Sequence, residues 1–491
     1  MTLRRQATAG VFWVGISTVV NNLFVMLTRY ILARMLLPAE FGLVSMAYIA
    51  IDFLQMFREM GFASALIYRK GDIHKAANTM FVSVLIIATI LFALAFLTAP
   101  YVAIFFRSPE LQPVLRALSV NILISAFGQV QFSLLAKSLS FREKLLPDLV
   151  PTVAYGVVSV SLALMGMGVW SLVIARIVDS ILTSALAWLV VPWWRPNLRF
   201  DREEAKALFD YGKHIVGSSV LIYFITNLDN TFIGRVLGEE QLGYYGFAYN
   251  QANLPATQIS RIIGQVLFPA YSKIQGDIVA LRAAFFKTLH YVSLLSIPIS
   301  VGMITFAAPF IQTLYGGRWA PAIVPLQILG VYGLLRAVAV NMGSIFKAGG
   351  RPNWLTYIAL WRLATMGIFL YPATKYYGIV GVSVLSAIVA VVDFLISAAL
   401  TNKLIYGRLV DYIQALWLPT VLSVLSALLA TWSYARMAGR HDFIALVMAG
   451  ALMVIVYGLF VLILDKEARR FIMNLLVDAE EARKRLMGNA A

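Results

Sequence analysis

The sequence has no cysteine in its 491 residues, which excludes disulfide bonds and metal sites built on thiolates. Charged side chains are also scarce, at 13% of the chain, where a typical soluble domain carries about 25%. Hydrophobic residues make up 60%, and the mean hydropathy is +0.80. One soluble core could not hide so much apolar surface, so most of it must face lipid. The composition therefore predicts a multi-pass membrane protein.

Signatures of several kinds of chemistry are missing as well. There is no Walker A motif, so we expect no direct drive by ATP. The four histidines show no metal-ligand spacing. We therefore expect no cofactor, no metal, and a chain that is not an enzyme. The net charge of +16 is spread over short loops without the dense basic patch of a nucleic-acid site, so we expect no nucleic-acid partner.

Apolar runs of roughly 18 to 26 residues recur along the chain, and each is long enough to cross a bilayer as a helix. Arg4 and Arg5 precede the first run, which is too long for a cleavable signal peptide, so we predict a membrane helix there. The predicted fold class is an all-α polytopic membrane protein with fourteen helices. Their expected ranges are 9–34, 40–60, 76–99, 112–137, 146–166, 168–191, 212–236, 242–268, 283–307, 321–347, 352–374, 376–402, 412–434 and 443–464.

The basic residues predict which side each loop faces. With the N-terminus in the cytoplasm, 26 of the 40 lysines and arginines fall in cytoplasmic loops and termini, and seven fall in outer loops. This excess follows the positive-inside rule, and no inversion occurs along the chain. We therefore expect both termini to be cytoplasmic.

A segment of eleven residues occurs twice in altered form. The first copy is Leu32–Gly42 and the second is Ile233–Gly243, each between two long apolar runs. Further matches follow in the same order, among them Lys137 with Lys347. Such a duplication inside an apolar chain is typical of transporters built from two related halves.

The repeated unit contains six predicted helices. An even number of crossings gives both copies the same orientation, which predicts two lobes related by a pseudo-two-fold axis along the membrane normal, with a cavity between them. The expected domains are the first lobe at 1–200, the second lobe at 201–405, two further membrane helices at 406–465, and a basic cytoplasmic tail at 466–491.

Three segments resemble a known family. LARMLLPAEFGLVSM at 32–46 resembles the first-loop hallmark of polysaccharide exporters in the multidrug/oligosaccharidyl-lipid/polysaccharide superfamily. LYGGRWAPAIVPLQILGVYGLLRAV at 314–338 and KAGGRPNWLTY at 347–357 resemble the same family's helix 9–10 loop and helix 10–11 turn. The similarity covers about residues 5–400 and suggests a Wzx-type flippase of the exopolysaccharide branch.

This resemblance implies a transporter that carries undecaprenyl-pyrophosphate-linked oligosaccharide repeat units from the inner to the outer leaflet of the bacterial cytoplasmic membrane. The implied partners are that lipid-linked oligosaccharide, membrane lipid, and a polymerase with other polysaccharide-assembly proteins. One alternative is an ion-coupled drug antiporter of the same superfamily, whose cavity should be acidic to suit cationic drugs. Another is a membrane glycosyltransferase, polymerase or ligase acting on the same lipid. Such enzymes need a catalytic centre and usually a large outer loop, whereas the outer loops predicted here are short.

Seven arginines remain in the predicted membrane helices once those assigned to the loops and termini are set aside. One arginine at a helix centre costs about 2.5–3.5 kcal/mol, so seven facing lipid would cost on the order of 20 kcal/mol. Most must face a cavity, pair with acids or reach the headgroups. Arg176 has Asp179 three residues on, and Arg362 could be matched by Asp393, so we interpret both as structural. Arg116 lies near a helix start and could reach the headgroups.

The other four arginines are candidates for a substrate site. Guanidinium groups suit a pyrophosphate by fork geometry and permanent charge, and tyrosine and asparagine suit sugar hydroxyls. Polar residues at helical spacing accompany these arginines on the first, seventh and eighth predicted helices. The expected substrate-binding residues are Arg29, Arg58, Arg261, Arg336, Asn22, Tyr249, Asn253, Asn227 and Asn230. The alternative is that they only join helices by polar contacts.

Three acidic residues complete the predicted site. Asp52 and Glu59 share one face of the second predicted helix, and Asp229 lies on the seventh. A carboxylate buried in the membrane can carry a proton or hold Na⁺, so we predict that these residues couple transport to H⁺ or Na⁺. The alternative is that they are counter-ions for Arg58 or Arg29.

Overall fold

The computed structural model describes residues 20–59, 61–68, 72–138, 140, 143–439 and 442–470. Side chains are described for these residues except at 59, 214–215, 218 and 258–266. Over this part of the chain the regular structure is helical, and no strand is present. The first half of the first predicted helix and most of the predicted tail lie outside the described residues.

Contacts divide the chain into two compact units. The first comprises residues 1–246 and 370–379, and the second comprises 247–369 and 380–491. The packing boundary thus falls just after the second copy of the duplicated segment, whereas the lobe boundary expected from the repeat falls before it.

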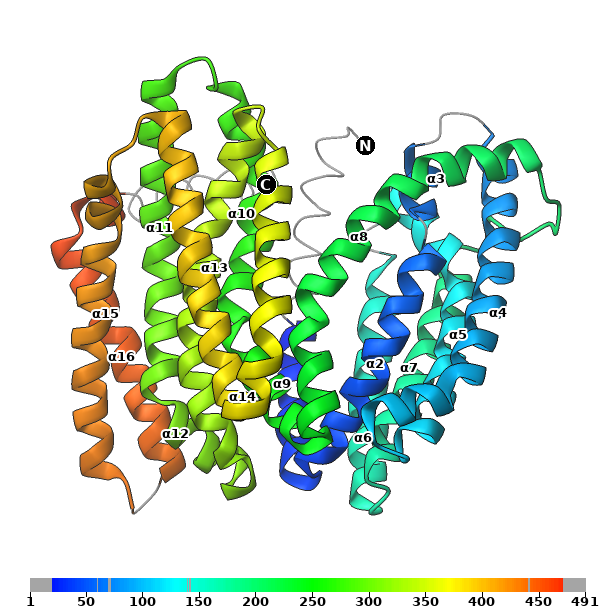
Figure 1. The fold of residues 1–491 in the computed structure, drawn as a ribbon, viewed down its shortest axis with the longest axis horizontal. Coiled ribbons are helices and arrows are strands. Elements are labelled where there is room, and N and C mark those ends of the chain that lie inside the picture. The colour runs from blue at the N-terminus through cyan, green and yellow to red at the C-terminus, as the bar shows by residue number, and fades with distance from the viewer. Residues whose placement is uncertain are drawn as a thin grey trace, which may run out of the picture. The chain divides into compact units, whose positions relative to one another are not determined.

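The first unit is a bundle of long helices (Figure 1). A helix over 20–35 is followed by α2 (Pro38–Glu59), α3 (Phe62–Tyr68), α4 (Ile73–Phe106), α5 (Leu111–Lys137), α6 (Leu145–Leu164), α7 (Val169–Val190), α8 (Arg202–Leu237) and the start of α9 (Glu239–Ala252). Helix α5 packs against α4, α7 and α2, and α8 packs against α2 and α4. Helix α5 is therefore central to this unit, and it contacts both α2 and α7, the helices that carry Arg58 and Arg176.

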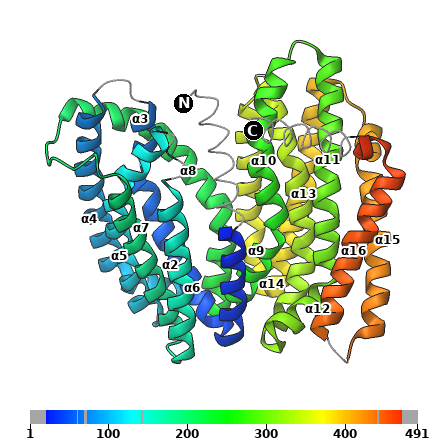
Figure 2. The same ribbon diagram turned by 180° about the vertical axis from the view of Figure 1, so that it is seen from behind.

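The second unit is also helical (Figure 2). It contains α10 (Leu254–Lys273), α11 (Ile278–Thr305), α12 (Ala307–Phe310), the π-helix η1 (Ile311–Tyr315), the 3₁₀-helix η2 (Gly317–Ala322), α13 (Ile323–Ala348), most of α14 (Asn353–Ile405), α15 (Leu409–Met437) and α16 (Asp442–Leu464). Helix α13 packs between α10 and α11, and α15 packs between α11 and α16.

Ten helices of the described residues are long and apolar enough to cross a membrane. Each overlaps a predicted range, and α14 covers two of them. The remaining predicted ranges are helical over their described residues, in the helix over 20–35, in α8, and in α9 with α10. The prediction of an all-α, multi-pass membrane protein is confirmed.

Several predicted helix boundaries differ from the structure. Helix α4 ends at Phe106 where the expected end is 99, and α8 begins at Arg202 where the expected start is 212. The helix expected over 242–268 is interrupted at Asn253, because Pro255 has no N–H to bond to the carbonyl four residues before it. The two helices expected over 352–374 and 376–402 are both present in α14 and meet at a kink at Gly378, where φ is 60° and ψ is −150°. Glycine adopts this backbone conformation at little cost.

Large apolar side chains lie exposed on the outside of both units. Leu97 on α4 is 68% exposed, and Val454 and Ile463 on α16 are 72% and 65% exposed. Such continuous apolar exposure is disfavoured in water but is ordinary against lipid tails. The apolar outer faces of α4 and α16 therefore suit contact with the lipid tails of a bilayer.

The loop before α8 is fixed to the start of α4 by polar contacts. Asp201 caps α8 by accepting from the N–H of Glu204 at 2.9 Å, and it pairs with Lys75 at 2.9 Å. The Glu204 N–H and the Lys75 ammonium hold the pKa of Asp201 below its usual value. This loop lies between the ranges predicted for the sixth and seventh membrane helices, 168–191 and 212–236.

The two copies of the duplicated segment pack against each other through glycine. A Cβ on Gly42 would lie 1.7 Å from the carbonyl oxygen of Glu239, and a Cβ on Gly243 would lie 2.0 Å from that of Pro38. Pro38 and Glu239 occupy the same position in the repeat, as do the two glycines. Each glycine therefore packs on the equivalent carbonyl of the other copy, the reciprocal pattern that a two-fold relation between the turns produces.

Gly42→Ala and Gly243→Ala should each destabilise the protein, by about 1–3 kcal/mol, because an added methyl group has no room against a backbone carbonyl. The measurement is thermal unfolding of the purified protein in detergent. Gly246→Ala is the matched control, since nothing lies within 4 Å of its added Cβ on the same helix α9. Equal melting temperatures for all three variants would contradict the close contact.

Candidate functional site

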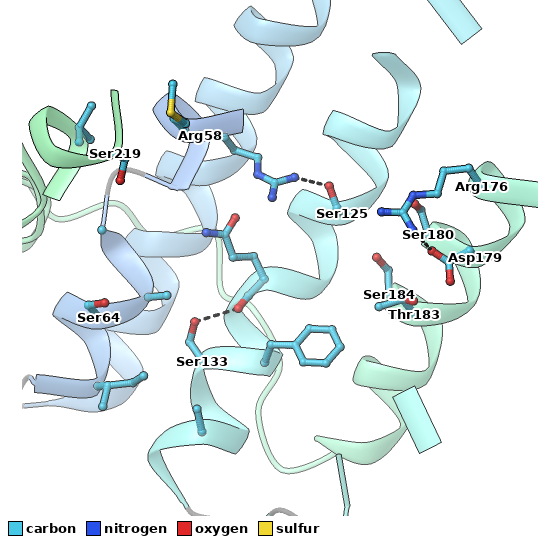
Figure 3. A pocket seen from close by; sticks show the side chains of 18 residues that line it. Arg58, Ser64, Ser125, Ser133, Arg176, Asp179, Ser180, Thr183, Ser184 and Ser219 are labelled. Atoms are coloured by element: carbon cyan, nitrogen blue, oxygen red, sulfur yellow. Dashed lines mark hydrogen bonds and ion pairs between the residues drawn. The ribbon is translucent and has the colours of Figure 1, made fainter. Parts of the chain in front are cut away.

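A polar cavity of about 520 Å³ lies inside the first unit (Figure 3). It is bounded by α2, α3, α5, α7 and α8, and all of these except the short α3 overlap ranges that the sequence assigns to the membrane. Three charged residues, Arg58, Arg176 and Asp179, line it. Its hydroxyl-bearing lining residues are Ser64, Ser125, Ser133, Ser180, Thr183, Ser184 and Ser219.

Arg58 lies near the end of α2 and is 6% exposed. Its Nη1 donates to the hydroxyl of Ser125 on α5, and that hydroxyl donates in turn to the carbonyl of Asn121. Arg58 from α2 and Arg176 from α7 point toward the same space, with Ser125 between them (Figure 3). The two guanidinium groups therefore concentrate positive charge in this cavity.

Arg176 and Asp179 also line a second, smaller cavity. Their ion pair, 3.0 Å from Nη1 to Oδ2, confirms the predicted contact along one helix. The smaller cavity measures about 330 Å³ and includes Arg29 from the first helix. Its other lining residues are Val25, Thr28, Tyr48, Thr152 and Tyr155. The Arg176–Asp179 pair thus forms part of the wall between the two cavities. Among the described side chains, Arg29, Arg58, Arg176 and Asp179 are the charged groups that line them.

The other predicted residues of the first unit have different surroundings. Asn22 is exposed and lines neither cavity. Asn227 donates to the carbonyl of Tyr223 at 3.2 Å and lines an aromatic groove between α2, α4 and α8. Asn230 donates its backbone N–H to the carboxylate of Asp229 at 2.8 Å. These three residues are therefore separate from the cationic cavities.

In the second unit the structure brings three predicted residues into one cluster. Arg336 donates to the amide oxygen of Asn253 at 3.0 Å and to the hydroxyl of Tyr332 at 3.3 Å. The Tyr332 hydroxyl lies 3.3 Å from that of Tyr249. A Cβ on Gly333 would lie 1.9 Å from the carbonyl oxygen of Ala252, so α13 approaches the end of α9 closely. Arg261 lies on α10, and its side chain is outside the described residues.

The predicted acidic residues also differ in their surroundings. Asp229 is 5% exposed, and its Oδ2 accepts from the hydroxyl of Tyr245 at 2.7 Å. Asp52 is exposed on α2, and its charge interacts with that of Arg176. The side chain of Glu59 lies outside the described residues.

Arg362 makes the ion pair expected of it, and Arg116, which was expected to reach the headgroups, contacts α4. Nε of Arg362 lies 2.6 Å from Oδ2 of Asp393, and the pair joins the two halves of α14. Arg116 donates to the carbonyl of Phe96 at 3.3 Å, with its guanidinium over that ring. Neither residue lines the two cavities of the first unit.

The sequence interpretation missed the hydroxyl-bearing side chains of the larger cavity. On α7 they follow Arg176 and Asp179 at helical spacing, as Ser180 and Thr183, and this spacing was the available signal. Serine and threonine in membrane helices commonly bond to their own backbone, so their presence alone does not identify a polar face. The interpretation of Arg176 as structural was incomplete in the same way. It pairs with Asp179 as expected, and it also lines the cavity.

Comparison with curated proteins finds relatives over most of the chain. It is 27% identical over 431 residues to the teichuronic acid biosynthesis protein TuaB of Bacillus subtilis (strain 168), covering 87% of this chain and 89% of that protein. The lipopolysaccharide biosynthesis protein WzxC of Escherichia coli (strain K12) is 26% identical over 437 residues, with 86% and 87% covered. The succinoglycan biosynthesis transport protein ExoT of Rhizobium meliloti (strain 1021) is 27% identical over 373 residues, with 75% of each covered.

Solved structures share the fold. The lipid II flippase MurJ in an inward closed conformation has a TM-score of 0.73 at 16% identity, covering 93% of this chain and 99% of that one. An inward-facing multidrug resistance transporter of the MATE family, from the MOP superfamily, has a TM-score of 0.61 at 19% identity, with 78% and 94% covered. At these identities the likeness shows the fold alone, which is that of MOP-superfamily transporters.

A family model supplies the more specific assignment. The model described as "Polysaccharide biosynthesis protein" matches residues 31–324, which is more than half of the chain. It includes the first hallmark segment and part of the second. The resemblance seen in the sequence is confirmed, and the chain belongs to this family of polysaccharide biosynthesis proteins.

Proposed function

We propose that the protein is a flippase for lipid-linked oligosaccharides. It moves undecaprenyl-pyrophosphate-linked repeat units from the inner to the outer leaflet of the bacterial cytoplasmic membrane, where a polymerase and other assembly proteins use them for surface polysaccharide. The observation that carries this proposal is the placement of Arg29, Arg58 and Arg176 on two cavities with a shared wall. The family membership and the relatives' names, which concern several surface polysaccharides, support it.

The chemistry of these cavities suits a sugar pyrophosphate. Guanidinium groups bind phosphate oxygens with two parallel hydrogen bonds, and their positive charge acts more strongly in a site shielded from water. Among the described side chains, Asp179 is the one carboxylate lining these cavities, so it compensates only part of the positive charge of their arginines. A polyprenyl tail is as apolar as the exposed helix faces, so it would remain in the bilayer while the head group crosses.

The proposed architecture has fourteen membrane helices, in two six-helix lobes with two further helices. Transport would proceed by alternating access between the lobes. Support comes from the reciprocal packing of the duplicated turns and from solved MATE transporters in inward-facing and outward-facing conformations. We propose that the cluster of Arg336, Asn253 and Tyr249 in the second unit, together with Arg261, also takes part in substrate binding.

In the proposed topology both termini are cytoplasmic, as the distribution of lysine and arginine favours. Because the native chain has no cysteine, single cysteines report the topology without background. A cysteine replacing Lys347 should react only with a reagent on the cytoplasmic side, and one replacing Arg436 only with a reagent added outside. The opposite labelling pattern would overturn the topology.

The alternatives fit the cavities less well. A cation or drug antiporter of the same superfamily should offer acidic groups to its substrate, whereas arginines outnumber carboxylates here. A glycosyltransferase, polymerase or ligase would need a catalytic centre that reaches the sugar at the membrane surface. The cationic lining is inside the helical bundle, which favours passage of an anionic head group.

Arg29→Ala and Arg58→Ala should each reduce polymer export at least tenfold, because a charge-assisted hydrogen bond contributes about 1.5–3 kcal/mol. Export is measured as surface polysaccharide per cell, with the amount of membrane-inserted protein determined in parallel. Arg116→Ala is the matched control, an arginine from the same unit that lines neither cavity, and should export normally. Normal export by both cavity variants would overturn the proposed anion site.

We further propose that Asp229, held by Tyr245, couples transport to H⁺ or Na⁺, with Asp52 and Glu59 as additional carboxylates. Asp229→Asn should abolish the stimulation of transport by an ion gradient in reconstituted vesicles, because the amide cannot release a proton or neutralise a cation. Asp210→Asn, at the exposed end of the same helix, should leave the stimulation intact. Transport by the native protein that is indifferent to both gradients would remove the coupling role.

A further inference from the structure

Two polar stripes face the larger cavity from neighbouring helices. On α7, Arg176, Asp179, Ser180 and Thr183 recur at the spacing that places them on one helical face. On α5, Ser125, Gln129 and Ser133 are four residues apart and line the same cavity. Figure 3 shows the labelled members of both stripes around the cavity. A membrane helix carries such a stripe only where something other than lipid meets it.

The stripes do not serve mainly to join α5 to α7. Ser133 donates to the carbonyl of Gln129 on its own helix. Hydrogen bonds between the two helices come from Ser184, which donates to the carbonyl of Ile124 at 2.8 Å, and from Trp188, which donates to that of Phe127 at 2.9 Å. Ser180 and Thr183 make no side-chain hydrogen bond to the described residues, and Oε1 of Gln129 is buried without a partner among them. A buried polar atom without a partner is costly, so the amide oxygen of Gln129 needs a ligand or water, and the half-buried hydroxyls of Ser180 and Thr183 are open to the same ligand.

The composition of this stretch is that of a carbohydrate site. Hydroxyl and amide groups both donate and accept, which matches sugar hydroxyls, whereas a phosphate offers acceptors only. The ring of Phe132 lines the same cavity and provides an apolar surface for the face of a sugar. From Arg176 to Thr183 the helix rises by about 10 Å, which is enough for a sugar ring to lie alongside.

We propose that the larger cavity contains a sugar subsite, formed by Ser180 and Thr183 of α7 with Gln129 and Phe132 of α5. This inference rests on the proposed flippase function. The pyrophosphate lies where Arg29, Arg58 and Arg176 approach the shared wall, and the first sugar of the glycan lies along the polar stripe. In the proposed topology α5 and α7 run toward the cytoplasm, so the sugar subsite opens on the side from which the repeat unit is loaded.

The subsite contributes selectivity for glycosylated lipid over the bare carrier. A site that hydrogen-bonds a hydroxyl loses binding when that hydroxyl is missing, because its own polar groups are left without partners. The same reasoning predicts that removing the protein's hydroxyls weakens binding only when a sugar is present.

The test compares two ligands on the double variant Ser180→Ala/Thr183→Val, purified in lipid nanodiscs. One ligand is the lipid-linked glycan fraction extracted from the host's membranes, and the other is undecaprenyl pyrophosphate. Loss of two hydrogen bonds should weaken binding of the glycan-bearing lipid roughly tenfold and leave binding of undecaprenyl pyrophosphate unchanged. Thr98→Val, which removes a hydroxyl exposed on α4, is the matched control and should bind both ligands as the native protein does.

The outcomes separate the subsite from the proposed function. Unchanged binding of the glycan-bearing lipid, or equal losses for both ligands, overturns the sugar subsite and leaves the flippase proposal standing. A native protein that binds neither ligand overturns the flippase proposal and the subsite with it. If the double variant does not fold, Thr183→Val is compared with Thr183→Ser, which keeps the hydroxyl and should bind normally.

Discussion

The high free energy of an unpaired charge in hydrocarbon organises this protein. A polar side chain in a membrane helix must find a partner within the protein or face water, since lipid offers neither hydrogen bonds nor counter-charge. Arg362 meets Asp393, Arg336 meets Asn253 and Tyr332, and Asp229 meets Tyr245. Other polar side chains, among them Arg29 and Arg176, line cavities between the helices of the first unit. The cationic cavities of the first unit are therefore where we propose that the protein accepts an anion, while the surrounding helices remain compatible with lipid.

The duplicated turn has a part in this arrangement that its sequence alone did not reveal. Each copy provides a glycine that accepts the backbone of the other copy, so the second helix of the first half and the start of the eighth predicted helix approach at Gly42 and Gly243. The arginines of the two copies lie instead on aromatic rings, Arg34 over Tyr30 and Arg235 over Phe105. The motif thus acts as scaffold, and the chemistry lies deeper along the helices that follow it.

Much of the fold could be predicted from the sequence, because long apolar runs and the basic residues between them follow directly from the thickness and polarity of a bilayer. The interruption at Asn253 follows from Pro255, a residue visible in the sequence, but its effect depends on how α13 packs nearby. The site was harder to predict. The energetic cost of a charge in the membrane pointed to Arg29 and Arg58, which line the cavities, whereas nothing comparable pointed to Ser180, Thr183 and Gln129. Uncharged polar residues stand out only when a cavity brings them together. Arg176 and Asp179 were correctly paired, and only the structure shows that their pair also separates two cavities.

The central claim is that this chain itself carries the head group of a lipid-linked glycan across the membrane. The most direct measurement uses purified protein in proteoliposomes loaded with lipid-linked glycan from the host's membranes, with a sugar-binding lectin added outside to detect the glycan that reaches the outer leaflet. The account predicts that the glycan initially protected in the inner leaflet becomes accessible to the lectin in vesicles containing the protein. Accessibility no greater than in protein-free vesicles, with the protein folded and correctly inserted, would contradict it.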